Sequence, residues 1–220
     1  MSMAVNAQID FGEITFGVRA GANFTTITGD LDLSEIGISM SRKMKPGFQL
    51  GVVANIPMSN EKITFQPGII FTQQGAKWKG SGSANWGTPV NLDADVEMLL
   101  NYLQIPLNFQ YKYDLNGGNT LLFQGGPYLG YGLSGKLKMK VTASALGVSE
   151  SNSDEESIDF GNDGDFKSLD FGLGLGAGML FKERIQVGLG YNLGLVDIEG
   201  EGEGIKNNGI ALTITYIFGK

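Results

Sequence analysis

The sequence predicts an all-β fold, an eight-stranded antiparallel up-and-down transmembrane β-barrel, and three observations support this class. Apolar residues recur at every second position in eight runs distributed along the 220 residues, and two residues is the period of a β-strand. Each alternating run has at least the roughly 9–11 residues that a tilted strand needs to cross a bilayer. The connections between runs are alternately short and long, as in barrels with short periplasmic turns and long extracellular loops.

The strands follow from this alternation in chain order. In the first, Phe16 and Val18 share one face while Arg19 lies on the other, and the pattern repeats along the chain. The predicted strands are residues 16–24, 46–56, 63–73, 99–111, 121–133, 169–181, 185–195 and 208–218. The short connections are residues 57–62, 114–120 and 182–184, and the long polar connections are residues 25–45, 74–98, 134–168 and 196–207. An even number of strands places both termini of the barrel on the short-turn side.

Three prolines complicate this assignment. Pro67, Pro106 and Pro127 fall inside predicted strands, and each removes one backbone donor from the ladder. We therefore expect β-bulges or local register breaks near them.

The contents of the two strand faces indicate which one meets lipid. An eight-stranded barrel has little room inside. If the apolar face pointed inward, its bulky side chains would overfill the lumen, whereas the opposite face is rich in glycine and would fit. Among the 16 Lys and Arg and 23 Asp and Glu residues, only Arg19 and Asp170 lie within the predicted strands, both on the glycine-rich face. A soluble barrel is the alternative, but its outer surface would then be nearly uncharged, which disfavours solubility. We expect the apolar face to point outward.

Aromatic residues gather near the ends of the predicted strands, which is typical of the girdles at membrane interfaces. The predicted girdle on the short-turn side contains Phe16, Phe65, Phe109, Tyr111, Tyr216 and Phe218.

Composition narrows the function classes. The chain has no Cys and no His, and its formal net charge is −7. The missing thiols exclude disulfides and thiolate metal sites, and the acidic balance argues against nucleic acid as a partner. Histidine is the commonest general base in enzymes, so we expect no enzymatic activity and no cofactor.

The first seven residues do not belong to the alternating pattern of the barrel strands. Residues 1–7 are interpreted as a signal-peptide remnant or a cloning scar, because Val5-Asn6-Ala7 has the small residues of a cleavage site and Gln8 is a plausible first mature residue. An ordinary disordered terminus is the alternative. Residues 8–220 are predicted to form a single outer-membrane β-barrel domain.

The polar residues of the glycine-rich face are candidates for a network inside the lumen. Because eight strands leave little open space, we expect these side chains to plug the barrel and not to line a conduit. Arg19 lies toward the periplasmic half and Asp170 toward the extracellular rim, so each needs partners of its own. The predicted network contains Arg19, Gln49, Gln66, Tyr102, Gln104, Gln110, Gln124 and Asp170.

The long connections hold further candidates. Lys136, Lys138 and Lys140 continue the inward alternation of the fifth strand, and they could meet lipopolysaccharide phosphates or, as we favour, the acidic loop in an extended hairpin. Trp78 and Trp86 could bind sugars or proteins if exposed, although packing or interface anchoring is the favoured interpretation.

The acidic segment 149–165 raises the question of a metal site. Asp159, Asn162, Asp163 and Asp165 offer oxygen ligands for Ca²⁺. Their spacing does not match an EF-hand, and acidic loops are usually just solvated. We interpret the acidic series at Glu199, Glu201 and Glu203 in the same way. No metal site is therefore predicted.

A series of phrases resembles the PorT-like outer-membrane β-barrel family. The phrases run in order across nearly the whole chain and are broken only in the long loops. They are FGVRAGANFT (16–25), GFQLGVVANIP (47–57), FQPGIIFTQQGAK (65–77), LNYLQIPLNFQY (100–111), GGPYLGYGLSGK (125–136), LDFGLGLGAG (169–178), YNLGL (191–195) and KNNGIALTITYIF (206–218). One departure is the end, where Gly219 and Lys220 follow the expected terminal aromatic Phe218.

The resemblance implies an eight-stranded barrel in the outer membrane of Gram-negative bacteria, with founding members associated with protein secretion and no catalytic motif to carry over. We therefore expect a non-enzymatic, plugged barrel whose extracellular loops serve binding, assembly or envelope integrity. Transport of small or apolar solutes, or a part in protein secretion, is the alternative. The expected partners are outer-membrane lipid, lipopolysaccharide and an unidentified envelope or extracellular protein, with the chain itself a monomer.

Overall fold

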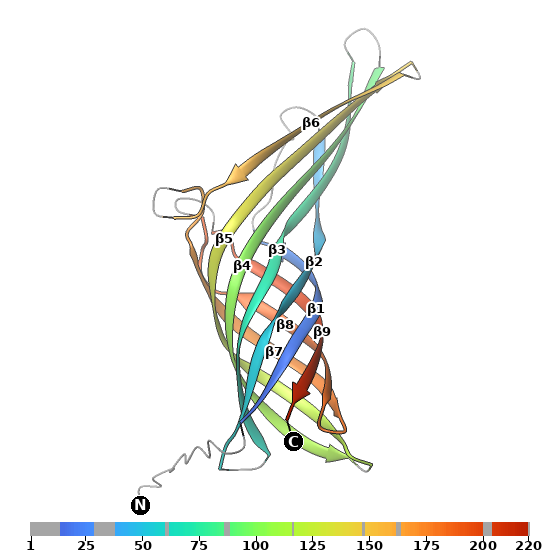
Figure 1. Cartoon of the computed structure of the whole chain (residues 1–220). Helices are drawn as coiled ribbons and strands as arrows, with labels where there is room; N and C mark the ends of the chain where they lie inside the picture. Colours follow the sequence, from blue (N-terminus) through green and yellow to red (C-terminus); the bar gives the residue numbers. More distant parts are fainter. Residues whose placement is uncertain are drawn as a thin grey trace, which may run out of the picture.

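The computed structural model describes residues 14–28, 38–59, 62–85, 89–115, 117–146, 148–161, 164–199 and 204–219, so the predicted N-terminal remnant 1–7 lies outside the described residues. These parts form one antiparallel system of strands (Figure 1). The strands are β1 (Thr15–Ile27), β2 (Ile38–Pro57), β3 (Ile63–Asn85), β4 (Pro89–Leu115), β5 (Asn119–Ala145), β6 (Val148–Ile158), β7 (Leu169–Phe181), β8 (Ile185–Gly194) and β9 (Asn207–Phe218). No helix among the described residues is long and apolar enough to cross a membrane.

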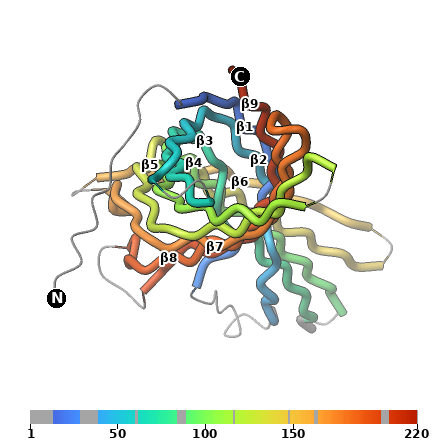
Figure 2. The backbone as a smooth tube through the Cα atoms, turned by 90° about the horizontal axis from the view of Figure 1, so that it is seen from below, coloured from blue at the N-terminus to red at the C-terminus, as the bar shows by residue number. Residues whose placement is uncertain are grey.

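Eight of these strands close into a ring, which confirms the predicted barrel (Figure 2). The ring order is β1-β2-β3-β4-β5-β7-β8-β9, and β9 returns to β1. The closing ladder pairs Phe16 with Phe218 at one end and Ile27 with Asn207 at the other. In lipid every backbone polar group must be paired within the protein, and a closed ring leaves no free sheet edge at membrane depth.

The long connections differ from the prediction, because much of their length continues as strands. β2, β3, β4 and β5 extend beyond the barrel, and β6 adds a ninth strand beside β5 (Figure 1). We call this part the extracellular sheet: residues 38–45, 76–85, 89–98, 135–145 and 148–158. The physical reason is that these segments still alternate, with apolar residues such as Trp78 and Val96 on one face and charged residues on the other. A continued ladder therefore satisfies the backbone and buries one face.

The expected bulges at the three prolines are absent. Pairing pauses between Pro67–Leu107 and Ile70–Gln104 and resumes in the same register, and Pro127 pairs with Leu173 in a continuous ladder. A similar pause next to Pro106 also keeps the register. Each proline removes only one donor, so a skipped pair is enough and no residue needs to be inserted.

Two register shifts occur elsewhere, near the extracellular end of the barrel. One lies in β2 between Met44 and Gln49. The other lies where β5 passes Asn101 and Tyr102 of β4, so that the consecutive residues Leu133 and Ser134 are both exposed. This β5 bulge reverses the inward and outward alternation above it. Lys136, Lys138 and Lys140 consequently project outward, contrary to the inward direction predicted for them.

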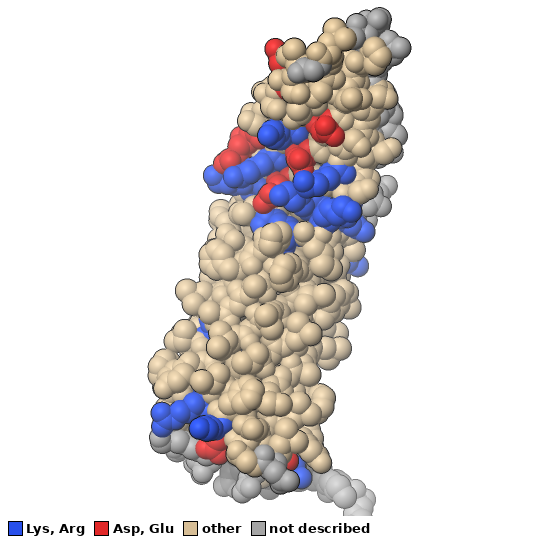
Figure 3. Space-filling view, turned by 90° about the vertical axis from the view of Figure 1, so that its right-hand side faces the viewer, with Lys and Arg blue, Asp and Glu red and all other residues tan. Residues whose placement is uncertain are grey.

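The outer surface divides into bands. A wide band without charge occupies the middle of the face in Figure 3, and charged residues gather above and below it. The apolar side chains of this band are well exposed in the isolated chain, for example Leu175 at 69%, as expected for groups that face lipid. Of the predicted girdle, Phe16, Phe109, Tyr111, Tyr216 and Phe218 are exposed. Phe65 is half-buried, with its ring centroid 5.0 Å from that of Phe109.

Candidate functional site

The periplasmic half of the lumen is filled by a polar network centred on Gln66, a fully buried residue of β3. Its amide nitrogen Nε2 donates to Asn55 Oδ1 at 2.6 Å and to Gln186 Oε1 at 3.1 Å. Its Oε1 accepts a hydrogen bond from Gln110 Nε2 at 2.9 Å and another from Arg19 Nη2. Because these partners come from β1, β2, β4 and β8, the side chain of Gln66 joins opposite walls of the barrel.

Arg19 is the charged member of this layer and is only 5% exposed. Besides Gln66, its Nε donates to Thr215 Oγ1 of β9 at 3.0 Å. No carboxylate among the described residues forms an ion pair with it. Gln110 extends the layer further by donating to Gln124 Oε1 at 3.1 Å. The guanidinium is thus solvated by neutral amide and hydroxyl oxygens, which replace water inside the barrel.

A second polar layer lies higher and joins β1, β2 and β3. Asn23 Nδ2 donates to Thr72 Oγ1 at 2.8 Å, and Gln49 Nε2 donates to Asn23 Oδ1 at 2.9 Å. Two residues further along β1, Thr25 Oγ1 donates to the carbonyl of Gly75 at 3.0 Å. Gly75 has a φ of +123°, a conformation that glycine adopts readily.

A third cluster contains the only charged residue of β7. Asp170, 1% exposed, accepts a hydrogen bond from Asn207 Nδ2 at 3.1 Å, and the same nitrogen lies 3.3 Å from the hydroxyl of Tyr102. The ring of Tyr128 packs over Gly172, where a Cβ atom would come within 2.5 Å of it. Arg19 and Asp170 therefore belong to separate clusters with separate partners, as their heights along the barrel predicted.

Little space remains between these layers. A lumen cavity of about 50 Å³ is lined by residues that include Gln104, Asn108 and Asn192. A volume of this size holds only a few water molecules. Gln104 is buried on the predicted face but forms no hydrogen bond with a described side chain or backbone group.

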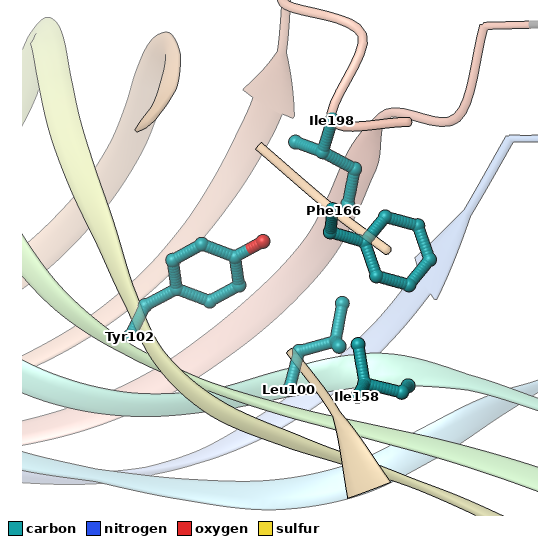
Figure 4. Packing of buried hydrophobic residues seen from close by; sticks show 5 residues of the cluster. All are labelled: Leu100, Tyr102, Ile158, Phe166 and Ile198. Carbon is teal, nitrogen blue, oxygen red and sulfur yellow. The ribbon is translucent and has the colours of Figure 1, made fainter. Parts of the chain in front are cut away.

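An apolar lid covers the extracellular end of the lumen (Figure 4). Leu100 and Tyr102 of β4 pack against Ile158, Phe166 and Ile198, which come from the end of β6 and from the segments before β7 and after β8. Ile198 and Leu100 are fully buried. The sequence singled out Tyr102 as a lumen residue but not Ile158, Phe166 or Ile198, because these three lie in segments without a regular apolar alternation.

The lid is anchored to the barrel wall by Phe160. Its ring centroid lies 5.5 Å from that of Tyr102 in an edge-on arrangement. A Cβ atom at Gly132 would lie 2.3 Å from the same Phe160 ring, so the absence of a side chain on β5 makes room for it. A glycine on the inward face near the rim was therefore a usable signal for a packed lid.

A second apolar cluster lines the inner face of the extracellular sheet. Trp78 of β3, only 5% exposed, packs with Ile27, Ala76 and Val96. This residue is therefore not the exposed binding aromatic that was one of its two interpretations. Trp86 lies outside the described residues.

Apolar residues line one side of the periplasmic end of the lumen. Leu122, Leu180 and Ile217 form a buried cluster on the inward face of β5, β7 and β9. Beside this cluster a vestibule of about 420 Å³ opens toward the short turns and reaches the polar layer at Asn55 and Gln110. The Gln66 layer itself therefore closes the lumen at this end, whereas the apolar lid covers the other end.

The acidic segment contains no metal cage among its described residues. The backbone N–H of Asp159 donates to Asp165 Oδ2 at 2.9 Å, which uses one of the candidate ligands to close a turn. Asn162 and Asp163 lie outside the described residues, as do Glu201 and Glu203. The part of the chain that the structure describes contains no group of three or more acidic residues arranged for a metal ion.

The lysines of β5 meet the acidic segment in an extended hairpin, as the favoured interpretation predicted, but they point outward and not inward. Lys136 Nζ and Lys138 Nζ lie 2.5 Å and 3.2 Å from the carboxylate of Glu155 on β6. Hydrogen bonds from both lysines lower the pKa of this carboxyl below its ordinary value. The acidic segment and the lysines form an extended hairpin, and they meet on its outward face.

A closed ring of eight strands with an uncharged outer band and a polar interior defines an integral membrane β-barrel. The model of the family described as outer membrane protein beta-barrel domain matches residues 6–200. The chain therefore belongs to this family and is an outer-membrane protein. No curated protein matches the sequence.

Three solved structures are similar to this chain over most of its length. Neisserial surface protein A (NspA) shares 11% identity, with 92% of this chain and 97% of that chain covered and a TM-score of 0.38. Ail, the attachment invasion locus protein of Yersinia pestis, in complex with the heparin analogue sucrose octasulfate, shares 16% identity over 94% of this chain and 99% of that chain, with a TM-score of 0.37. The outer membrane protein AlkL in lipid bilayers shares 13% identity over 100% and 98%, with a TM-score of 0.28.

Proposed function

We propose that this outer-membrane barrel is plugged and non-enzymatic, and that it acts as a membrane anchor for its extracellular sheet, which serves binding, assembly or envelope integrity. The observation that carries the proposal is the filled lumen. Gln66 and its partners join opposite walls, an apolar lid covers the extracellular end, and the cavity between these two layers measures about 50 Å³. A cavity of this size holds only a few water molecules, which supports a lumen closed to larger solutes.

Two further features support the proposal. The chain contains neither His nor Cys, so the commonest general base and the strongest side-chain nucleophile are missing. The barrel also closes within one chain through the β1–β9 ladder, which suits a monomer. Among the described residues, the extracellular sheet has five strand segments, which offer a surface on which a partner could dock.

We also propose that the chain lies in the PorT-like branch of its family, and that a part in protein secretion is the second candidate function. The ordered series of phrases from residue 16 to residue 218 favours it. With a plugged lumen, such a part would be that of a scaffold at the membrane surface and not that of a conduit for the secreted chain.

Release of solutes from proteoliposomes tests the plugged barrel against the transport alternative. The purified protein is refolded into liposomes loaded with a small sugar or a fluorescent apolar solute, and an open porin serves as the positive control. We expect release no faster than from empty liposomes for both solutes. Release of either solute that depends on the amount of folded protein would contradict the proposal and favour transport.

A further inference from the structure

We propose that six outward lysines of the extracellular sheet form a binding surface for the phosphate groups of lipopolysaccharide in the outer leaflet. We call this surface the lysine belt. The proposal does not depend on whether the lumen conducts, because the belt lies on the outside of the molecule. Its members are Lys43 of β2, Lys77 and Lys79 of β3, and Lys136, Lys138 and Lys140 of β5.

The belt begins where the lipid-facing band ends. Leu99 of β4 is the last apolar residue of the outward face, and Lys136 is its direct partner on β5. One row higher, Lys77 pairs with Glu97 and Glu97 pairs with Lys138. Figure 3 shows the resulting band of charge directly above the uncharged surface. This is the height at which lipid headgroups meet the protein.

The lysines are held on the outward face by the fold. The β5 bulge at Leu133 and Ser134 reverses the alternation, so that Leu137 turns inward and its lysine neighbours turn outward. On β3 the inward position between the two belt lysines is filled by the buried Trp78. The apolar packing of the inner face therefore fixes the direction of the charges.

The charge of these rows is unbalanced in favour of cations. Among the residues of the outward rows, three carboxylates accompany the six lysines, those of Asp95, Glu97 and Glu155, so these rows carry a net charge of +3, while the exposed Asp154 and Glu156 stand on the alternate positions of β6. Lys77 lies 2.9 Å from Glu97, and Lys79 lies 3.1 Å from Asp95. These ion pairs hold the two lysine side chains along the sheet. Because the outward rows contain more lysines than carboxylates, a positive charge remains for an external anion.

Two lysines strengthen the case for an external anion. Lys43 stands directly opposite Lys77 in the β2–β3 ladder, and like charges in that position repel each other. Neither Lys43 nor Lys140 forms an ion pair with a described carboxylate. A shallow depression of about 460 Å³ on the same face is lined by four lysines and four acidic residues, and the lysines are Lys77, Lys79, Lys138 and Lys140. The positive excess of the belt therefore comes from Lys43 and Lys136 at its edges, and a phosphate would bind where lysines without an acidic partner, such as Lys140, adjoin the paired ones.

Lipopolysaccharide is the occupant that position and charge favour. The belt lies at the extracellular end, where the outer leaflet presents lipopolysaccharide phosphates, whereas the short turns face the phospholipid leaflet. Lysine binds phosphate as a compact point charge. Each lysine near an anionic surface strengthens binding by roughly fivefold, so three of them contribute on the order of 100-fold.

Binding of the folded protein in detergent to purified lipopolysaccharide tests the proposal. The measured quantity is the dissociation constant at 0.15 M salt, and the probes are lipopolysaccharide, dephosphorylated lipopolysaccharide, phosphatidylglycerol vesicles and inorganic phosphate. The belt variant removes three positive charges from the extracellular end, and the matched control removes three from the periplasmic end. The belt variant is Lys136→Gln/Lys138→Gln/Lys140→Gln, and the control is Lys62→Gln/Lys112→Gln/Lys182→Gln.

We expect the belt variant to bind lipopolysaccharide at least tenfold more weakly, the control to match the unaltered protein, and dephosphorylation to weaken binding to a similar degree. Equal affinity of the belt variant and the unaltered protein would overturn the proposal. Equal affinity for phosphatidylglycerol would overturn lipopolysaccharide as the specific occupant, and competition by millimolar phosphate would indicate a site for free anions instead. If the belt variant does not fold, Asp95→Asn/Glu97→Gln provides the opposite test, because removing these acids should tighten binding and an unchanged affinity would contradict the proposal.

Discussion

Replacement of Gln66 by alanine tests the lumen network at its centre. The residue is fully buried, and its amide makes four hydrogen bonds, to Arg19, Asn55, Gln110 and Gln186. The variant Gln66→Ala removes all four at once. It also leaves the buried guanidinium of Arg19 with the Thr215 hydroxyl as its remaining side-chain acceptor.

The expected loss follows from the kinds of bond. A hydrogen bond to a charged group is worth about 1.5–3 kcal/mol, and each neutral one about 0.5–1.5 kcal/mol. One charged and three neutral bonds therefore total about 3–7.5 kcal/mol. Water that enters the space left by the side chain recovers part of this free energy, so we expect the free energy of unfolding to fall by about 3–5 kcal/mol.

Gln104→Ala is the matched control. Gln104 has the same side chain on the same inward face, but it lines the cavity and makes no hydrogen bond with a described residue, so we expect a loss below about 1 kcal/mol. Reversible urea unfolding in detergent or lipid, followed by tryptophan fluorescence and by the heat-dependent gel shift of folded barrels, measures both variants. Equal losses for the two variants, or a loss below about 1 kcal/mol for Gln66→Ala, would refute the hydrogen-bonded plug.

Three further predictions concern the wall, the sheet and the lid. Gly172→Ala should cost about 1–3 kcal/mol by overpacking, because its Cβ would lie 2.3 Å from a backbone oxygen, whereas Gly190→Ala, with its nearest atom at 3.4 Å, should stay within about 0.5 kcal/mol in the same urea assay. The lowered pKa of Glu155 means that its pairing stabilises the sheet above the ordinary value of 4.5 and is lost as the pH falls through the lower folded value. Carboxyl-carbon NMR titration should show this low midpoint rising in Lys136→Gln, and an unchanged midpoint would contradict the pairing. Phe166→Ala should speed proteolysis of the lid without weakening the heat-dependent gel shift, since the lid packs outside the membrane band, and unchanged proteolysis would show that Phe166 does not hold it.

The barrel could be predicted from the sequence because one physical rule governs it. Lipid on one side and a narrow lumen on the other force opposite chemistries onto alternate residues, as with Phe16 and Arg19 of β1. The same rule placed Gln66 and Asp170 inside, where both are buried. Partners such as Thr215 and Asn207 could not be assigned, because hydrogen bonds across the lumen depend on strand register, which alternation alone does not determine.

The extracellular part was harder to predict for a related reason. Above the membrane the alternation is inverted, because the outward residues become charged and the inward residues apolar, so segments that lack an outward apolar face were assigned as polar connections. The β5 bulge then shifts the alternation by one residue, which is why the direction of Lys136 and its neighbours was wrong. The lid residues Phe166 and Ile198 stand in irregular segments, and only tertiary packing shows that they are buried.

The current through single barrels in a planar lipid bilayer tests the central claim, a closed lumen, most directly. The unaltered protein, inserted in folded form and confirmed by its gel shift, is predicted to give no steady conductance above that of the bare membrane. An Arg19→Ala/Gln66→Ala variant that folds should give a higher conductance than the unaltered protein, because it removes the guanidinium and the amide on which the hydrogen bonds of the periplasmic layer converge. Steady, reproducible pore currents from the unaltered protein would contradict the plugged barrel.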